Sequence, residues 1–224
     1  MKKLFIAALL VACSLSSHAQ FWMGGAFSIH SSTKPRYESI DLTIGNFNGN
    51  LLIQLDKMRT FGFAPEIGYD FGKWSLGFAL GYQNGSADLF YRDELAQYDI
   101  EGKILSTVLI ISPFMRRNAL TIDRLSFFMD FGFDYAVLDN KINGSVMPAH
   151  SHGVIQTFID SKNSSGFQVG LSPGVAFNIT DKWSALFKCG FLGYSDGGYT
   201  GFNEEGFHFN LSTRQSSFGM YYRF

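Results

Sequence analysis

Six ionisable residues lie in strand-like segments whose neighbours are apolar or small, and their chemistry includes ion pairing and proton transfer. They are Glu66, Asp70, Asp130, Asp134, Lys188 and Arg116. Acids enclosed in a narrow interior need basic partners, because an unpaired buried charge is costly. We therefore predict that they form one lumen charge network, which acts either as an ion-pair plug or as a selectivity filter or proton path. Arg223 is a further candidate for the same network.

A second group with chemical potential surrounds His150 and His152, which flank Ser151. Together with Asp139 or Asp160, these residues could form a surface metal site or a hydrolase dyad. A His-x-His pair without a fixed third ligand is a weak metal signal, however, and no hydrolase motif accompanies it. We therefore predict no catalytic residues, no metal site and no cofactor, and we do not expect an enzyme.

The elements that must position these residues are strands, and the stretch from Thr60 to Tyr82 shows the pattern most clearly. It reads as two strands joined by a tight turn, with residues alternating at a period of two. One face is bulky and aromatic, whereas the other is mainly Gly, Ala and Ser with an occasional acid such as Glu66. The small face has too little charge for a water-exposed surface but fits the interior of a narrow barrel. The bulky face then points outward, into lipid.

The composition agrees with a membrane barrel and excludes other classes of protein. Hydrophobic residues make up 46% of the 224-residue chain, yet no apolar run after the N-terminus reaches the roughly 18 residues of a membrane-spanning helix. The net charge of −1 provides no basic footprint for nucleic acid. Cys189 lies among apolar residues, where we expect it to act as a small hydrophobic side chain.

The first 19 residues have the features of a secretory signal. Lys2 and Lys3 precede a short apolar core, and Ser17-His18-Ala19 is a small-x-small cleavage site that would leave Gln20 as the new N-terminus. An alternative is lipoprotein processing, with Cys13 as the lipidated residue. We therefore expect a signal peptide over residues 1–19 and one barrel domain over residues 20–224.

About eight strands follow from the alternation, at residues 21–29, 60–71, 74–82, 103–115, 124–138, 164–177, 183–194 and 206–224. The connections between them alternate between short turns and long segments at residues 30–59, 84–102, 139–163 and 195–205. Short periplasmic turns with longer outer loops are typical of bacterial outer-membrane barrels. We therefore predict an all-β, transmembrane, antiparallel up-and-down β-barrel in the outer membrane of a Gram-negative cell, with both termini periplasmic. In strand 183–194 we expect Phe187, Cys189 and Phe191 to face outward.

Aromatic residues near the predicted periplasmic ends of the strands form a candidate interfacial girdle. Its members are Trp22, Phe71, Trp74, Phe114, Trp183 and Tyr222. Because aromatic rings favour the boundary between lipid and water, this distribution supports the predicted placement of the strand ends.

Several short motifs resemble a known family. They are Pro65-Glu66-Ile67-Gly68-Tyr69, Leu76-Gly77, Gly81-Tyr82, Ser112-Pro113-Phe114 and the ending Phe218-Gly219-Met220-Tyr221-Tyr222-Arg223-Phe224. They resemble the outer-membrane β-barrel family common in Bacteroidetes, related in architecture to small OmpA- and OmpX-type barrels. The resemblance implies an eight-stranded barrel inserted by the outer-membrane assembly machinery, with Phe224 as the assembly signal, and it implies no catalytic site. In the last strand the bulky face changes parity between Phe209 and Phe218, which predicts a bulge near residues 212–217.

The expected function is a structural or surface-interaction role through the outer loops, with an occluded lumen. A small passive diffusion pore is the first alternative, because many inward residues are glycines. An outer-membrane lipid- or peptide-modifying enzyme is the second. The expected partners are outer-membrane lipids, the assembly machinery and an extracellular ligand of the loops, with no nucleic acid.

Overall fold

The computed structural model describes residues 19–32, 36–44, 47–93, 98–148, 156–196, 205–210 and 216–224. Nearly all of these residues belong to antiparallel strands. Within this part of the chain, no helix is long and apolar enough to cross a membrane. The predicted signal peptide of residues 1–19 lies almost entirely outside the described residues, so its cleavage remains a prediction.

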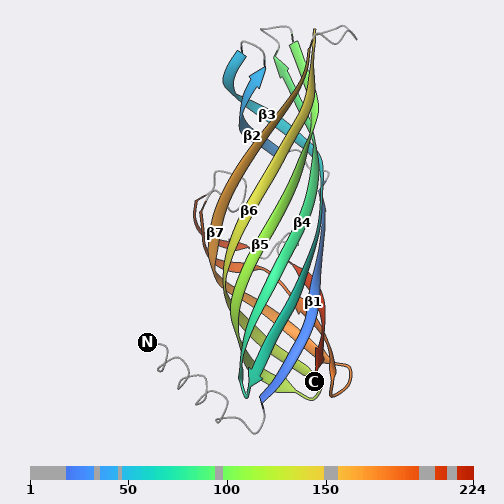
Figure 1. Cartoon of the computed structure of the whole chain (residues 1–224), viewed down its shortest axis with the longest axis vertical. Helices are drawn as coiled ribbons and strands as arrows, with labels where there is room; N and C mark the ends of the chain where they lie inside the picture. Colours follow the sequence, from blue (N-terminus) through green and yellow to red (C-terminus); the bar gives the residue numbers. More distant parts are fainter. Residues whose placement is uncertain are drawn as a thin grey trace, which may run out of the picture.

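Eleven strands make one continuous sheet (Figure 1). The long ones are β3 (Phe47–Phe71), β4 (Trp74–Asp93), β5 (Tyr98–Ile122), β6 (Leu125–Pro148) and β7 (Gln156–Asn178). The shorter ones are β1 (Ala19–Ser32), β2 (Arg36–Ile44), β8 (Trp183–Lys188), β9 (Phe191–Ser195), β10 (Gly206–Asn210) and β11 (Ser217–Arg223).

The sheet closes on itself. From β3 to β7 each strand pairs with the next, and β7–β8, β8–β11, β11–β1 and β1–β3 pairs complete the ring. Three wall positions consist of two strands each, because β2 continues β1 along β3, β9 continues β8 along β7, and β10 and β11 pair with β9 and β8. The described strands therefore occupy eight wall positions, which confirms the predicted antiparallel barrel. Closure satisfies the backbone hydrogen bonds that lipid cannot provide.

The first strand of the barrel, β1, begins at the same end of the cylinder at which the last strand, β11, finishes. We call this the short-turn end. There Trp22 of β1 pairs with Arg223 of β11. The tight connections Gly72–Lys73, Asp123–Arg124 and residues 179–182 lie at the same end. Gly72 has φ +76°, which glycine adopts without steric cost in so tight a turn.

The opposite end differs from the prediction, because three segments expected to be long irregular connections are mostly strand. Residues 30–59 contain β2 and the first part of β3, residues 84–102 contain the β4–β5 hairpin arms, and residues 139–163 contain those of β6–β7. Strands β2 to β7 thus rise well beyond β1 and β8–β11 as a tall upper extension (Figure 1).

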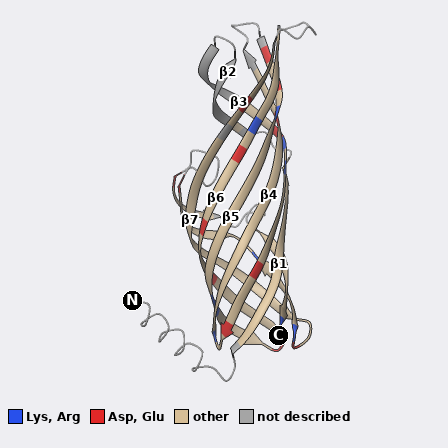
Figure 2. Ribbon diagram, in the orientation of Figure 1, with Lys and Arg blue, Asp and Glu red and all other residues tan. Residues whose placement is uncertain are grey.

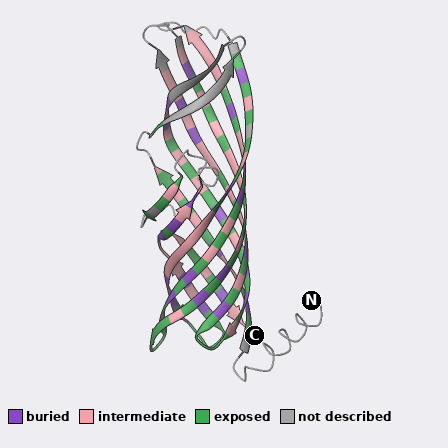
Figure 3. Cartoon of the chain, turned by 90° about the vertical axis from the view of Figure 1, so that its left-hand side faces the viewer, coloured by how far each residue is buried: buried purple, intermediate pink, exposed green. Residues whose placement is uncertain are grey.

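The lower wall carries its apolar residues on the outside, whereas the upper extension packs a cluster of them inside; we call this change the inversion of sidedness. In the lower wall the bulky residues face outward: Phe61, Ile67, Leu76, Phe131 and their neighbours are more than one-third exposed. Figure 3 shows this alternation of exposed and covered positions along the strands. In the upper extension a cluster of apolar residues turns inward, and Glu101, Lys103 and Lys141 are exposed. Figure 2 shows charged residues along these strands. Because the outer face of these strands is charged and not apolar, they lack the pattern that identified the strands of the lower wall in the sequence.

Interruptions at two places along the chain change which parity faces inward. In β3 a register shift at Asp56–Arg59, with Lys57 at φ +48°, separates inward Leu55 from inward Gly62. Between β8 and β9 the strand breaks at Cys189–Gly190, with Gly190 at φ +73°.

The second break overturns one prediction. Phe191 is only 5% exposed and faces inward, whereas Leu192 faces outward with 48% exposure. The physical reason is the extra residue at the break, which shifts the alternation by one position. The bulge predicted near residues 212–217 falls largely outside the described residues.

Candidate functional site

The barrel interior near the short-turn end holds the candidate site. Five side chains meet there from five wall positions: Glu66 on β3, Arg116 on β5, Asp130 on β6, Lys188 on β8 and Tyr221 on β11. Each faces inward because small and bulky residues alternate along its strand. We call these five residues the plug.

The plug is held by close charge-assisted contacts, one between adjacent strands and two from Lys188 to strands that do not pair with β8. The Arg116 guanidinium donates two hydrogen bonds to the Asp130 carboxylate, from Nε to Oδ1 at 2.6 Å and from Nη2 to Oδ2 at 2.8 Å. The Lys188 Nζ lies 3.0 Å from Glu66 Oε1 and 3.2 Å from Asp130 Oδ2. Because two wall positions separate β3 from β8, the Lys188–Glu66 pair spans the interior instead of running along the wall.

Tyr221 joins the two ion pairs. Its hydroxyl donates to Glu66 Oε2 and accepts a bond from Arg116 Nη2 at 3.1 Å. Glu66, Arg116 and Asp130 are at most 5% exposed. Two acids and two bases balance, and each of the four has an oppositely charged partner, which is a condition under which buried ion pairs are tolerated.

Aromatic rings surround the Arg116 guanidinium and fill the interior around the plug. Its Cζ lies 4.1 Å from the ring centre of Phe128, 5.3 Å from that of Phe114 and 5.8 Å from that of Trp22. These distances are within the range of cation–π attraction. Trp22 stacks on Tyr221 with ring centres 4.4 Å apart.

Three inward glycines provide the space that these rings occupy. A side chain at Gly68 would collide with Trp22, one at Gly77 with Phe114, and one at Gly174 with Phe128. The room that the sequence leaves at glycine is therefore taken by aromatic rings from neighbouring strands and does not form a water path.

Below the plug, a second polar layer closes the short-turn end. Arg223 Nε lies 3.4 Å from Asp70 Oδ2, and Ser75 donates to Asp70 Oδ1 at 2.6 Å. Arg223 also donates to Ser184 Oγ at 2.7 Å. The cavity between the two layers has a volume of about 40 Å³, which is room for a few water molecules at most.

Asp134 lies outside the plug. Its carboxylate accepts bonds from Ser112 Oγ and, at 2.8 Å, from Gln168 Nε2. The structure thus brings four of the six predicted network residues into one cluster, places Asp70 in the layer below with Arg223, and gives Asp134 neutral hydrogen-bond partners.

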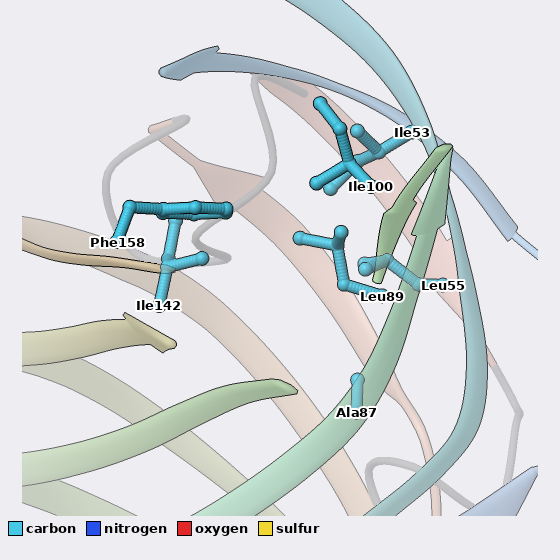
Figure 4. Close-up of a cluster of buried hydrophobic side chains, with 7 residues drawn as sticks. All are labelled: Ile53, Leu55, Ala87, Leu89, Ile100, Ile142 and Phe158. Atoms are coloured by element: carbon cyan, nitrogen blue, oxygen red, sulfur yellow. The ribbon is translucent and has the colours of Figure 1, made fainter. Parts of the chain in front are cut away.

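The interior of the upper extension is apolar instead of charged. Seven side chains from β3 to β7, all at most 8% exposed, pack there, as Figure 4 shows: Ile53, Leu55, Ala87, Leu89, Ile100, Ile142 and Phe158. We call them the upper apolar cluster. The described interior is therefore filled at two levels by different chemistry.

Comparison with known proteins assigns the family. Residues 5–224 match the model of the family described as "Outer membrane protein beta-barrel domain". The chain belongs to this outer-membrane β-barrel family. No curated protein sequence matches it significantly. Among solved structures it is similar to the translocator domain of autotransporter NalP from Neisseria meningitidis, with 12% identity, a TM-score of 0.35, and coverage of 100% of this chain and 95% of that one.

The outer face of this outer-membrane barrel carries part of the predicted girdle. Phe71, Trp74 and Trp183 are exposed by 37–43% at the short-turn end. Tyr222 is partly buried and packs edge-on against Trp183, with ring centres 5.0 Å apart. The role of Phe224 as an assembly signal remains a prediction.

Two predicted girdle residues were placed on the wrong face. Trp22 and Phe114 are 2% and 7% exposed and belong to the interior, where they pack around Arg116. The physical reason is parity, because Trp22 alternates with outward Phe21 and Met23 and therefore points inward. The inward glycines on neighbouring strands, at Gly68 and Gly77, are the sequence signal that could have located both rings.

The histidine alternative is not tested by the structure. His150 and His152 lie outside the described residues. Among the residues that are described, no group of three His, Cys, Asp or Glu side chains could hold a metal ion.

Proposed function

We propose that this outer-membrane barrel does not conduct and that it has a structural or surface-interaction role. The plug is the observation that supports this proposal, because Lys188 on β8 reaches Glu66 on β3 and Asp130 on β6, and the cavity below the plug has a volume of only about 40 Å³. The upper apolar cluster is a second barrier to water and ions. A passive diffusion pore would need the inward glycines to leave space, but around the plug aromatic rings occupy the space at Gly68, Gly77 and Gly174.

We further propose that both termini and the short turns face the periplasm and that the upper extension projects from the cell surface. The inversion of sidedness supports this, since charged residues on the outside of the extension suit water and not lipid. The upper extension, and the connections at its tip, would then be the part available to an extracellular ligand. Outer-membrane lipids and the assembly machinery are the other proposed partners, and neither nucleic acid nor an enzymatic reaction is part of the proposal.

A small barrel of the OmpA and OmpX type, from the Bacteroidetes, remains our proposal for the finer relationship. Eight wall positions and short turns beside the termini support it.

A liposome-swelling assay tests the proposal. We expect vesicles that contain the folded protein to swell in a small sugar no faster than protein-free vesicles. Swelling that rises with the amount of protein would show an open lumen and favour the pore alternative. A porin reconstituted at the same ratio provides the positive control.

A further inference from the structure

A charged side chain interrupts the outer apolar face of the lower wall near the short-turn end. Arg117 on β5 points outward, with Met115 before it and Ala119 after it on the same face. On the described part of β3, the outward positions from the short turn up to Phe61 are apolar or aromatic, and the next outward cation is Arg59, near the upper end of β1. An ionisable residue on a membrane-facing surface calls for a specific partner.

Within the described residues Arg117 has no carboxylate partner at ion-pair distance. Its guanidinium lies over the ring of Trp74, 5.1 Å from the ring centre, and Trp74 is directly opposite Arg117 in the β4–β5 pairing. Trp74 is the first residue after the β3–β4 turn, so Arg117 lies beside that turn, near the level where lipid headgroups are expected.

A groove of about 460 Å³ on the outer face adjoins this guanidinium. Its lining residues are Trp74, Met115, Arg117, Ala119, Met129, Phe131 and Leu171. Ala119 is skipped in the β5–β6 register, so a small side chain stands at a bulge beside the charge. The groove thus has a cationic and aromatic part beside the short turn and an apolar part farther along the strands, over Phe131 and Leu171.

We propose that this groove binds one glycerophospholipid of the leaflet at the short-turn end. Its phosphate would lie on the Arg117 guanidinium, and an acyl chain would run along Met115, Phe131 and Leu171. The cationic part of the groove matches the headgroup of such a lipid, and the apolar part matches its acyl chain. Arg117 supplies the positive charge that pairs with the phosphate. The site is separate from the plug, because Arg116 faces the interior and Arg117 the outside.

Native mass spectrometry of the folded protein in detergent, titrated with dipalmitoyl phosphatidylglycerol, tests the proposal. We expect the wild type to retain one lipid and Arg117→Gln to bind it about five-fold more weakly, the effect of one basic residue near a lipid surface. Ala119→Leu, which fills the groove and keeps the charge, should weaken retention as well. Dipalmitoylglycerol, which lacks the phosphate, should bind the wild type and Arg117→Gln equally weakly.

Lys182→Gln is the matched control. Lys182 is also an exposed cation at the short-turn end and lies 5.7 Å from the ring centre of Tyr222, but it is outside the groove. Its substitution should leave retention unchanged. Equal losses in the Lys182 and Arg117 variants, no loss in Arg117→Gln, or no lipid retained by the wild type would each overturn the proposal.

Discussion

At the scale of single residues, Arg116 is the centre of the plug. It binds Asp130 through two nitrogens, contacts Tyr221, and is enclosed by the rings of Phe128 and Phe114. Its removal would leave Asp130 buried with Lys188 as its remaining cation. The charges of the plug therefore depend on one another, because the loss of one leaves another buried without its full complement of partners and lowers the stability of the barrel.

Arg116→Ala should lower the free energy of unfolding by roughly 3–5 kcal/mol, the usual effect of removing one partner from a buried ion pair. Urea titration of the protein in lipid vesicles, followed by gel mobility, measures the change. Arg117→Ala is the neighbouring control, because it removes the same side chain from the outer face, and it should cost less than about 1 kcal/mol. Similar losses for both variants would contradict the role assigned to the plug.

The inward glycines give a second prediction at this scale. Gly77→Ala should destabilise the barrel by about 1–3 kcal/mol, because the new methyl group would overlap the ring of Phe114. Gly132→Ala is the control, since the nearest atom to its new methyl group would be 3.7 Å away. The same urea titration distinguishes them, and an unchanged midpoint for Gly77→Ala would show that the ring does not need the glycine.

At the scale of elements, period-two alternation determines which face of each strand meets lipid. It predicted the eight wall positions and the outward face of β3 to β6, because lipid requires apolar residues at every second position. It did not predict the upper extension, where Ile53 and Leu89 turn inward and charged residues face water. It also could not predict Phe191, because an extra residue at Cys189–Gly190 leaves little trace in the sequence.

The site was predictable to a similar degree. The acids and bases of the plug stand on inward positions of recognisable strands, so their convergence could be inferred from alternation and charge. Which acid meets which base depends on the register and the tilt of the strands, and neither is visible in one sequence. Trp22 shows the limit of position alone, because it stands at a strand end like a girdle residue but has the parity of the interior.

The facing of β1 and β8 can be measured with two single-tryptophan variants in vesicles of brominated phospholipid. Trp183, on the outer face of β8, should be strongly quenched by the bromine atoms, whereas Trp22, inside the barrel, should be protected. The remaining tryptophans are replaced by Phe in each variant. Strong quenching of Trp22 would place it in the lipid-facing girdle and contradict the interior packing described above.

At the scale of the whole molecule, the barrel combines a lower wall that is apolar outside with an upper extension that carries charged residues outside. Six wall positions, from β2 to β7, continue upward with an apolar interior, and the short turns and both termini of the barrel lie at the opposite end. A tall extension with polar residues outside suits an interaction surface held away from the membrane.

Cysteine labelling of intact cells tests the proposed orientation. With Cys189 replaced by Ser, a membrane-impermeant maleimide should label Ser161→Cys in the upper extension but not Arg124→Cys in a short turn. Both positions are exposed, so permeabilised cells should show labelling of both and confirm that the thiols are reactive. Labelling of Arg124→Cys alone in intact cells would reverse the orientation.

Single-channel recording in a planar bilayer tests the central claim, a closed lumen, most directly. For wild-type protein whose folding is verified by gel mobility, we expect no opening steps over a wide range of voltage. Stable and repeatable steps would contradict a plug formed by Glu66, Arg116, Asp130 and Lys188. Those four residues would then line a conducting path.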